Sequence, residues 1–168
     1  MARTSLVEFT AREKLNKMAV DVIHHAPDIA EATYSNGDLM AEQELITDAV
    51  VLDGGCCVLQ SICVIDKTDS VTSGITLVIT SHSTDFGTVG SAPSISAGDS
   101  DNSVALVEIN NFTDIGSARI GMKSNIGICM KSSSSSRNLR YAVINSSGGD
   151  IVIGSGEDIE FKFGIVKD

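Results

Sequence analysis

From about residue 30 onward, apolar residues recur at every second position in short segments that are separated by turn residues. The last segment shows this alternation most clearly, with charged residues or glycine between Ile159, Phe161, Phe163 and Ile165. A period of two is typical of a half-buried β-strand, because successive side chains point to opposite faces of the sheet. The chain also contains 18 Ile and 15 Val but only 9 Leu, which favours strands over helices. These features exclude a coiled coil, a collagen-like chain and a disordered chain that is poor in apolar residues.

The alternating segments are bounded by clear turn signals. Asn36-Gly37 and Gly54-Gly55 reach positive φ at little cost, as tight hairpins require, and the five serines at 132–136 predict a polar hairpin loop. Strands are predicted over residues 30–34, 45–52, 56–66, 74–81, 104–110, 117–123, 125–130, 139–145, 150–153 and 158–166. Short strands at this spacing in a chain of 168 residues predict one all-β fold, an antiparallel two-sheet sandwich of jelly-roll type.

The N-terminal residues follow a different pattern. Thr10 and Glu13 have the spacing of a helix capping box, and the apolar residues that follow them recur at helical intervals. We therefore expect one short amphipathic helix over about residues 11–25. The predicted division of the chain is an N-terminal arm plus this helix over residues 1–29 and the β-sandwich domain over residues 30–168.

The charge is unevenly distributed along the chain. The formal net charge is −10, whereas residues 1–17 carry four Lys or Arg and two Glu, so that segment has a net charge of +2 and the remainder −12. An acidic body argues against binding of nucleic acid or of an anionic membrane surface. The apolar runs are far shorter than the roughly 18 residues of a transmembrane helix. The charged N-terminal residues leave no apolar segment for a secretory signal, so we expect synthesis in the cytoplasm.

The sequence offers little for catalysis. It contains no phosphate-binding glycine loop, no nucleophile-elbow motif and no zinc-protease motif. Two of the three histidines suit the end of the predicted helix, and His82 suits a loop surface. Asp99 and Asp101 match a fragment of a calcium-binding loop or, alternatively, the polar start of a helical turn after Ser96. We expect no catalytic residue, no metal site and no cofactor, and we do not expect an enzyme.

A series of strand and turn segments occurs in a characteristic order between residues 45 and 168. The series is Ala49-Val50-Val51-Leu52-Asp53-Gly54-Gly55, Leu59-Gln60-Ser61-Ile62-Cys63-Val64-Ile65-Asp66, Leu77-Val78-Ile79, Phe86-Gly87-Thr88, Ser94-Ile95-Ser96, Asp114-Ile115-Gly116, Asn125-Ile126-Gly127-Ile128, residues 139–144 and Phe161-Lys162-Phe163-Gly164-Ile165. In this order the segments resemble the capsid decoration (cement) proteins of tailed bacteriophages, although Phe112 stands where many relatives have Trp. The resemblance implies a β-sandwich or jelly-roll body, a trimer on the outer face of an icosahedral shell, and neither catalysis nor a cofactor.

A cationic, apolar arm on an acidic body is typical of a protein that attaches to a partner. Together with this profile, the resemblance implies a structural virion protein that binds the outer capsid surface and stabilises it by bridging coat subunits. The expected partners are the major capsid protein and the other copies in a homotrimer, and the expected location is the exterior of the virion. We expect the arm to bind the capsid through Arg3, Leu6, Val7, Phe9, Arg12, Lys14 and Lys17. The alternative is a phage tail protein, an adhesin or a carbohydrate-binding β-sandwich module, and an enzyme on a jelly-roll scaffold is a third hypothesis.

Overall fold

The computed structural model describes residues 19–155 and 158–167, which form strands and one helical turn. In chain order the elements are β1 (Ala19–His25), β2 (Ala32–Tyr34), β3 (Leu39–Ile46), β4 (Cys56–Asp66), β5 (Ile75–Thr80), α2 (Ala97–Ser100), β6 (Ser103–Ile109), β7 (Phe112–Asp114), β8 (Arg119–Lys131), β9 (Leu139–Asn145), β10 (Ile151–Ile153) and β11 (Ile159–Lys167). No helix among these residues is long and apolar enough to cross a membrane.

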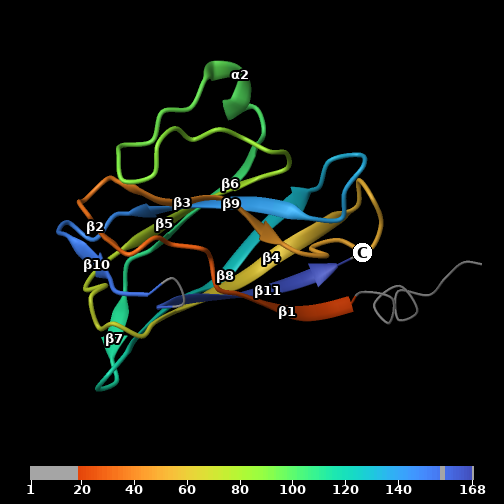
Figure 1. Cartoon of the computed structure of the whole chain (residues 1–168). Coiled ribbons are helices and arrows are strands. Elements are labelled where there is room, and N and C mark those ends of the chain that lie inside the picture. The colour runs from red at the N-terminus through yellow and green to blue at the C-terminus, as the bar shows by residue number, and fades with distance from the viewer. Residues whose placement is uncertain (1–18, 156–157, 168) are drawn as a thin grey trace, which may run out of the picture.

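The strands form two larger antiparallel sheets that face each other (Figure 1). One has five strands in the order β1-β11-β4-β8-β7, and the other has four in the order β3-β9-β5-β6. A two-stranded sheet of β10 and β2 lies at one end of the sandwich. The predicted all-β, two-sheet sandwich is therefore confirmed.

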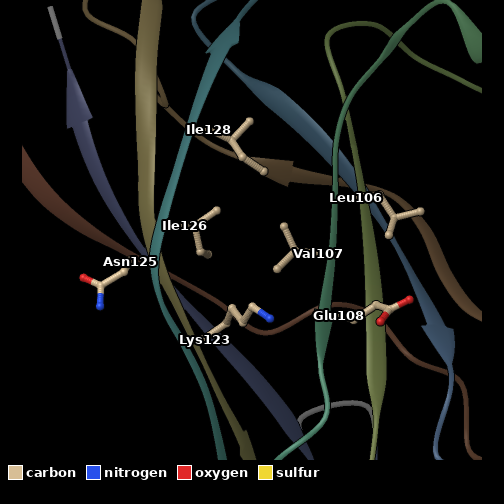
Figure 2. A pocket seen from close by; sticks show the side chains of 7 residues that line it. All are labelled: Leu106, Val107, Glu108, Lys123, Asn125, Ile126 and Ile128. Carbon is tan, nitrogen blue, oxygen red and sulfur yellow. The ribbon is translucent and has the colours of Figure 1, made fainter.

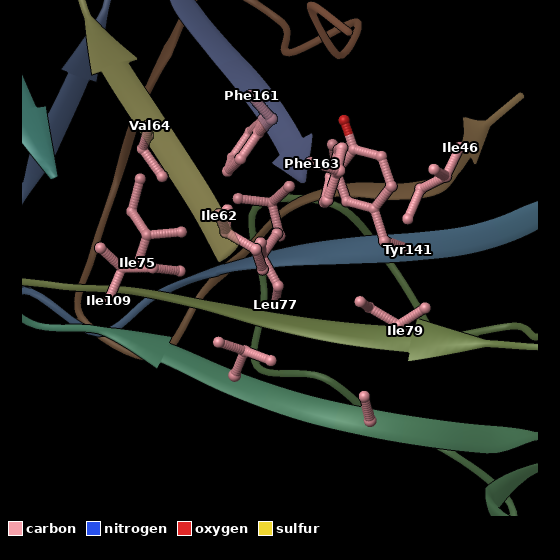
Figure 3. Packing of buried hydrophobic residues seen from close by; sticks show 14 of the residues in the cluster. Ile46, Ile62, Val64, Ile75, Leu77, Ile79, Ile109, Tyr141, Phe161 and Phe163 are labelled. Atoms are coloured by element: carbon pink, nitrogen blue, oxygen red, sulfur yellow. The ribbon is translucent and has the colours of Figure 1, made fainter. Parts of the chain in front are cut away.

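The core lies between the two large sheets and is filled by alternating side chains, as the sequence pattern predicts (Figure 3). Along β11 the burial alternates between buried and half-buried positions, and Phe161 and Phe163 are fully buried. The ring of Tyr141 on β9 lies edge-on to both, with ring centroids 5.5 Å from Phe161 and 5.2 Å from Phe163. These aromatic pairs join the two sheets near the middle of the sandwich.

The long segment between β5 and β6 covers the outer face of the four-stranded sheet (Figure 1). Phe86 from this segment is buried against Leu39 of β3 and Ala142 of β9. The helical turn α2 belongs to the same segment and begins where the sequence predicts, after Ser96, whose hydroxyl accepts a hydrogen bond from the Asp99 N–H. The Asp99 carboxylate in turn accepts a hydrogen bond from the Ser96 hydroxyl at 2.6 Å, so it takes part in capping the N-terminus of α2.

Asp66, at the end of β4, is a fully buried carboxylate that organises the following loop. Its oxygens accept hydrogen bonds from the Thr68 N–H at 2.9 Å, the Thr68 hydroxyl at 2.6 Å and the Val71 N–H at 2.7 Å. Buried polar groups must be paired, and these three donors satisfy the carboxylate.

The predicted helix over residues 11–25 is wrong for residues 19–25, which form the strand β1; the rest of it lies outside the described residues. β1 pairs with β11 in a continuous antiparallel register, from Ala19 opposite Lys167 to His25 opposite Phe161. The outer edge of β11 offers backbone donors and acceptors that β1 satisfies, and this tertiary pairing overrides a helical spacing of apolar residues. The division of the chain at residue 30 stays a prediction.

Two other predicted boundaries differ from the structure. The segment predicted as a strand at 45–52 is replaced by β3, which begins at Leu39 and ends at Ile46. Ala49 and Val50 are buried without being in a strand, and the Val50 N–H donates to the Arg137 carbonyl. Burial in a loop therefore accounts for the first half of an apolar run that resembles a strand, while Val51 and Leu52 of the same run are exposed. The strands predicted at 117–123 and 125–130 are one strand, β8.

Candidate functional site

Two strand edges on the same flank of the sandwich lack a full partner among the described strands. β6 is the last strand of the four-stranded sheet and pairs only with β5. β8 pairs with β4 over most of its length, but its other edge pairs with β7 only at residues 119–121. Exposed strand edges present backbone N–H and C=O groups that can pair with another chain. We call this side of the molecule, with β6 and residues 122–131 of β8, the open flank.

A groove of about 380 Å³ runs between β6 and β8 on the open flank. Figure 2 shows Val107 of β6 and Ile126 and Ile128 of β8 on its walls, with Lys123 reaching from β8 toward β6. Leu106, which also lines the groove, is 61% exposed. The groove therefore combines four apolar lining residues with two adjacent strand edges, and unpaired strand edges can pair with another chain.

The irregular backbone of β8 shapes this groove. Asn125 and Gly127 have positive φ values of 56° and 68°, and the pairing of β8 with β4 shifts register between Leu59 and Ser61. Asn and Gly tolerate this left-handed conformation better than other residues. A bulge of this kind bends the strand and changes which side chains share a face, so the strand does not read as one segment in the sequence.

Opposite charges stand at the rim of the groove. Glu108 lies on β6 and Lys123 on β8, both are exposed, and neither has an ion-pair partner within the described part of the chain. In the same part of the chain no group of three or more His, Cys, Asp or Glu could hold a metal ion. The groove is therefore suited to a surface that is apolar at its centre and carries both signs of charge at its edge.

The strand β1 forms the outer edge of the five-stranded sheet and lies within the segment 1–29 that was predicted as arm plus helix. Val20 and Val22 on its outward face are 78% and 54% exposed. Asp21 accepts a hydrogen bond from the Lys167 ammonium at 2.8 Å, and this charged donor lowers the pKa of Asp21. The edge strand thus exposes two apolar side chains on its outer face.

His25, predicted to end a helix, instead joins the two sheets. Its Nδ1 lies 2.7 Å from the Tyr141 hydroxyl, and its Nε2 lies 3.7 Å from the Glu44 carboxylate. Burial lowers the pKa of His25 and raises the pKa of Glu44, so both groups favour their neutral forms here more than they do in water. His24 faces outward near Glu160, at 3.4 Å, and His82 lies in a loop. The cluster around His25 links β1 to β3 and β9.

The residues predicted to contact the capsid all lie outside the described residues. They are Arg3, Leu6, Val7, Phe9, Arg12, Lys14 and Lys17, so their role stays a prediction. The structure adds the open flank, which sequence reasoning missed. The sequence of β6 contained a signal of the open flank. The inward-facing residues Ala105, Val107 and Ile109 are apolar, and so are Val104 and Leu106 at the alternate positions. A strand that is apolar at both parities has an outer face in need of a partner.

No protein-family model matches the chain, and no curated protein has a significantly similar sequence. Among solved structures, the capsid of Ralstonia phage GP4 matches 90% of this chain and 84% of its own, with 14% identity and a TM-score of 0.41. The structure of Tomato Aspermy Virus matches 89% of this chain and 76% of its own, with 9% identity and a TM-score of 0.42. The full particle of Israeli acute paralysis virus matches 99% and 81%, with 10% identity and a TM-score of 0.32. These are structures of viruses or their capsids, and at such distant similarity they assign no role to any residue of this chain.

Proposed function

We propose that the chain is a structural virion protein of the decoration type, which binds the outer surface of a tailed-phage capsid and bridges neighbouring coat subunits. The observation that carries the proposal is the open flank, where a groove with four apolar lining residues and two exposed strand edges equip the molecule to assemble with other protein chains, further copies of itself included. The ordered series of segments that resemble cement proteins supports the same function. The proposed partner is the major capsid protein, and the proposed location is the virion exterior after synthesis in the host cytoplasm.

We assign attachment to the N-terminal arm. Its net charge of +2 contrasts with −12 for the remainder, and it carries the apolar residues Leu6, Val7 and Phe9. Each of these side chains contributes roughly 1.5–3 kcal/mol if it becomes fully buried on a partner. The cations act chiefly on the encounter rate and the register of binding, so attachment weakens as the salt concentration rises.

We assign contacts between copies to the open flank. Around a three-fold axis, the β6 side of one flank meets the β8 side of the next, and this brings Glu108 of one copy near Lys123 of its neighbour. Burying the strand edges in this way removes an aggregation hazard, and a closed ring leaves no such edge exposed. Three arms on one trimer also act as linked ligands, which raises overall binding by a factor of about 10²–10⁴ over one arm.

Co-sedimentation with capsid shells built from the coat protein of the same phage tests the attachment. Deleting residues 1–9 should leave the β-type circular dichroism spectrum unchanged but abolish binding to the shells. Two matched full-length variants separate the contributions: serine at Leu6, Val7 and Phe9 should abolish binding, whereas glutamine at Arg3, Arg12, Lys14 and Lys17 should slow it and remove its salt dependence. Wild-type occupancy of the truncated protein would place the anchor on the sandwich. Failure of the full-length protein to bind shells would refute the decoration function itself.

A further inference from the structure

A second pocket lies on the four-stranded sheet, apart from the open flank and near the loop that contains the five serines at 132–136. It has a volume of about 190 Å³ and is enclosed by residues 81–83 after β5, the loop between β8 and β9, and Arg140 at the start of β9. Drug-sized ligands occupy pockets of about 300–1,000 Å³, so this one suits a smaller group. None of the side chains that line it is acidic, although the chain has a net charge of −10.

Arg140 differs from the other arginines that the structure describes. Arg119 pairs with Asp69, and Arg137 pairs with Asp48 at 2.9 Å, whereas Arg140 has no carboxylate partner among the described residues. Its guanidinium donates to the Gln43 carbonyl at 3.1 Å. A guanidinium has five N–H donors, so most of its donors remain available to a ligand in the pocket.

The backbone at Gln43 is strained in a way that fixes this arginine. Gln43 has a φ of 58°, which is uncommon for a residue with a side chain, and the pairing of β3 with β9 shifts register between Ala41 and Glu44. The carbonyl displaced by this bulge holds the Arg140 guanidinium, while the Gln43 side chain accepts a hydrogen bond from the Ser83 hydroxyl. Strain of this kind is concentrated at functional sites.

Apart from Leu45, the other residues that line the pocket are polar, and several of them present donors. Asn138 Oδ1 accepts from the Asp48 N–H at 2.8 Å, and its amide NH₂ has no partner among the described residues. His82 Nδ1 lies 2.8 Å from the Ser81 hydroxyl, so its Nε2 is left for another contact. Ser133 also lines the pocket, and its hydroxyl can donate.

We propose that this pocket is a binding site for a small oxyanion, a carboxylate or phosphate group, held by the Arg140 guanidinium with donors from Asn138, His82 and Ser133. A planar guanidinium matches two oxygens of such a group, and the surrounding donors complete its hydrogen bonds. The absence of lining carboxylates disfavours a cation, and the acidic body repels an extended polyanion. Binding of an oxyanion at this site is independent of whether the protein decorates a capsid.

Titrations followed by two-dimensional ¹H–¹⁵N NMR test this site at constant ionic strength, with sodium phosphate, sodium acetate, N-acetylneuraminate and, as a neutral control, glucose. We expect saturable shifts confined to residues 81–83, residues 132–138 and Arg140. The Arg140→Gln variant should bind at least tenfold more weakly, whereas Arg137→Gln, which removes an exposed arginine from the same loop region, should bind as the wild type does. His82→Ala changes an exposed side chain and keeps the backbone carbonyl to which Thr80 and Thr84 donate, and it should weaken binding several-fold.

The choice of anions identifies the source of the group. Saturation by phosphate alone assigns a phosphate group, and tighter binding of acetate or N-acetylneuraminate assigns a carboxylate. The proposal is overturned if no anion saturates the shifts up to 100 mM, or if glucose binds as tightly as the anions. It is also overturned if Arg140→Gln and Arg137→Gln bind the anions equally well.

Discussion

Replacing Leu106 with Asp should dissociate the proposed trimer without unfolding the sandwich. Leu106 lies on β6 at the open flank and is 61% exposed, so most of its surface is available to a neighbouring copy. Full burial of a leucine contributes about 1.5–3 kcal/mol, and burial of the exposed part therefore contributes about 1–2 kcal/mol per copy. Over three copies the loss is about 3–6 kcal/mol, which raises the equilibrium constant for dissociation into monomers by about 10²–10⁴.

Sedimentation equilibrium over a range of protein concentrations measures this change. The wild type should sediment with three times the monomer mass of 17.6 kDa, and Leu106→Asp should shift to monomers at concentrations where the wild type is intact. Val152→Asp is the matched control, because Val152 is 55% exposed but lies on β10 in the two-stranded sheet. The assignment of the open flank would be refuted if the wild type is monomeric at micromolar concentration. It would also be refuted if the Leu106→Asp trimer dissociates no more readily than the Val152→Asp trimer.

Two further predictions concern the stability of the sandwich. Asp66→Asn should lower the free energy of unfolding by about 2–4 kcal/mol in urea titrations, because the amide cannot accept from both Thr68 and the buried Val71 N–H. The control Asp85→Asn changes an exposed carboxylate that accepts from the Gly87 N–H, and it should lower that free energy far less. Equal losses in the two variants would contradict the reasoning. The pKa of His25 is lower in the folded protein than its ordinary value of 6.5, so as the pH falls the unfolded state is protonated before the folded state. The stability that neutral His25 contributes is therefore complete above pH 6.5 and is lost as the pH falls below it. Urea midpoints at pH 7.5 and 5.5 should therefore differ more for the wild type than for His25→Gln; an unchanged pH dependence would exclude His25 as its source.

The sequence predicted those parts of the fold in which local pattern and tertiary environment agree. β4 and β9 have the predicted boundaries, and the predicted alternation from Ile159 to Ile165 matches the burial pattern of β11. β1 was predicted as a helix because its pairing with β11 joins residues about 140 positions apart, which no local spacing reveals. The open flank depends on the shortness of β7 and on the bulge in β8, and these are features of strand pairing.

The polar pocket shows the same limit at the level of single residues. His82 and the five serines are recognisable in the sequence as loop residues, but Arg140 lies within a predicted strand and is not marked as a ligand by its neighbours. Its significance depends on a bulge at Gln43 in a different strand and on carboxylates that pair with the other arginines. Such a site is defined by what its arginine does not contact, and a sequence does not record that.

The register between β1 and β11 gives the proposed attachment of the arm a mechanical direction. The pairing begins at Ala19, which lies opposite Lys167, and continues without a shift to His25 opposite Phe161. Hydrogen bonds between antiparallel strands are perpendicular to the strands. Tension along β1 therefore shears all of these bonds at once, whereas a pull at right angles, away from β11, peels them one after another from Ala19. An arm anchored on an expanding shell would hold longest when its line of pull runs parallel to β1.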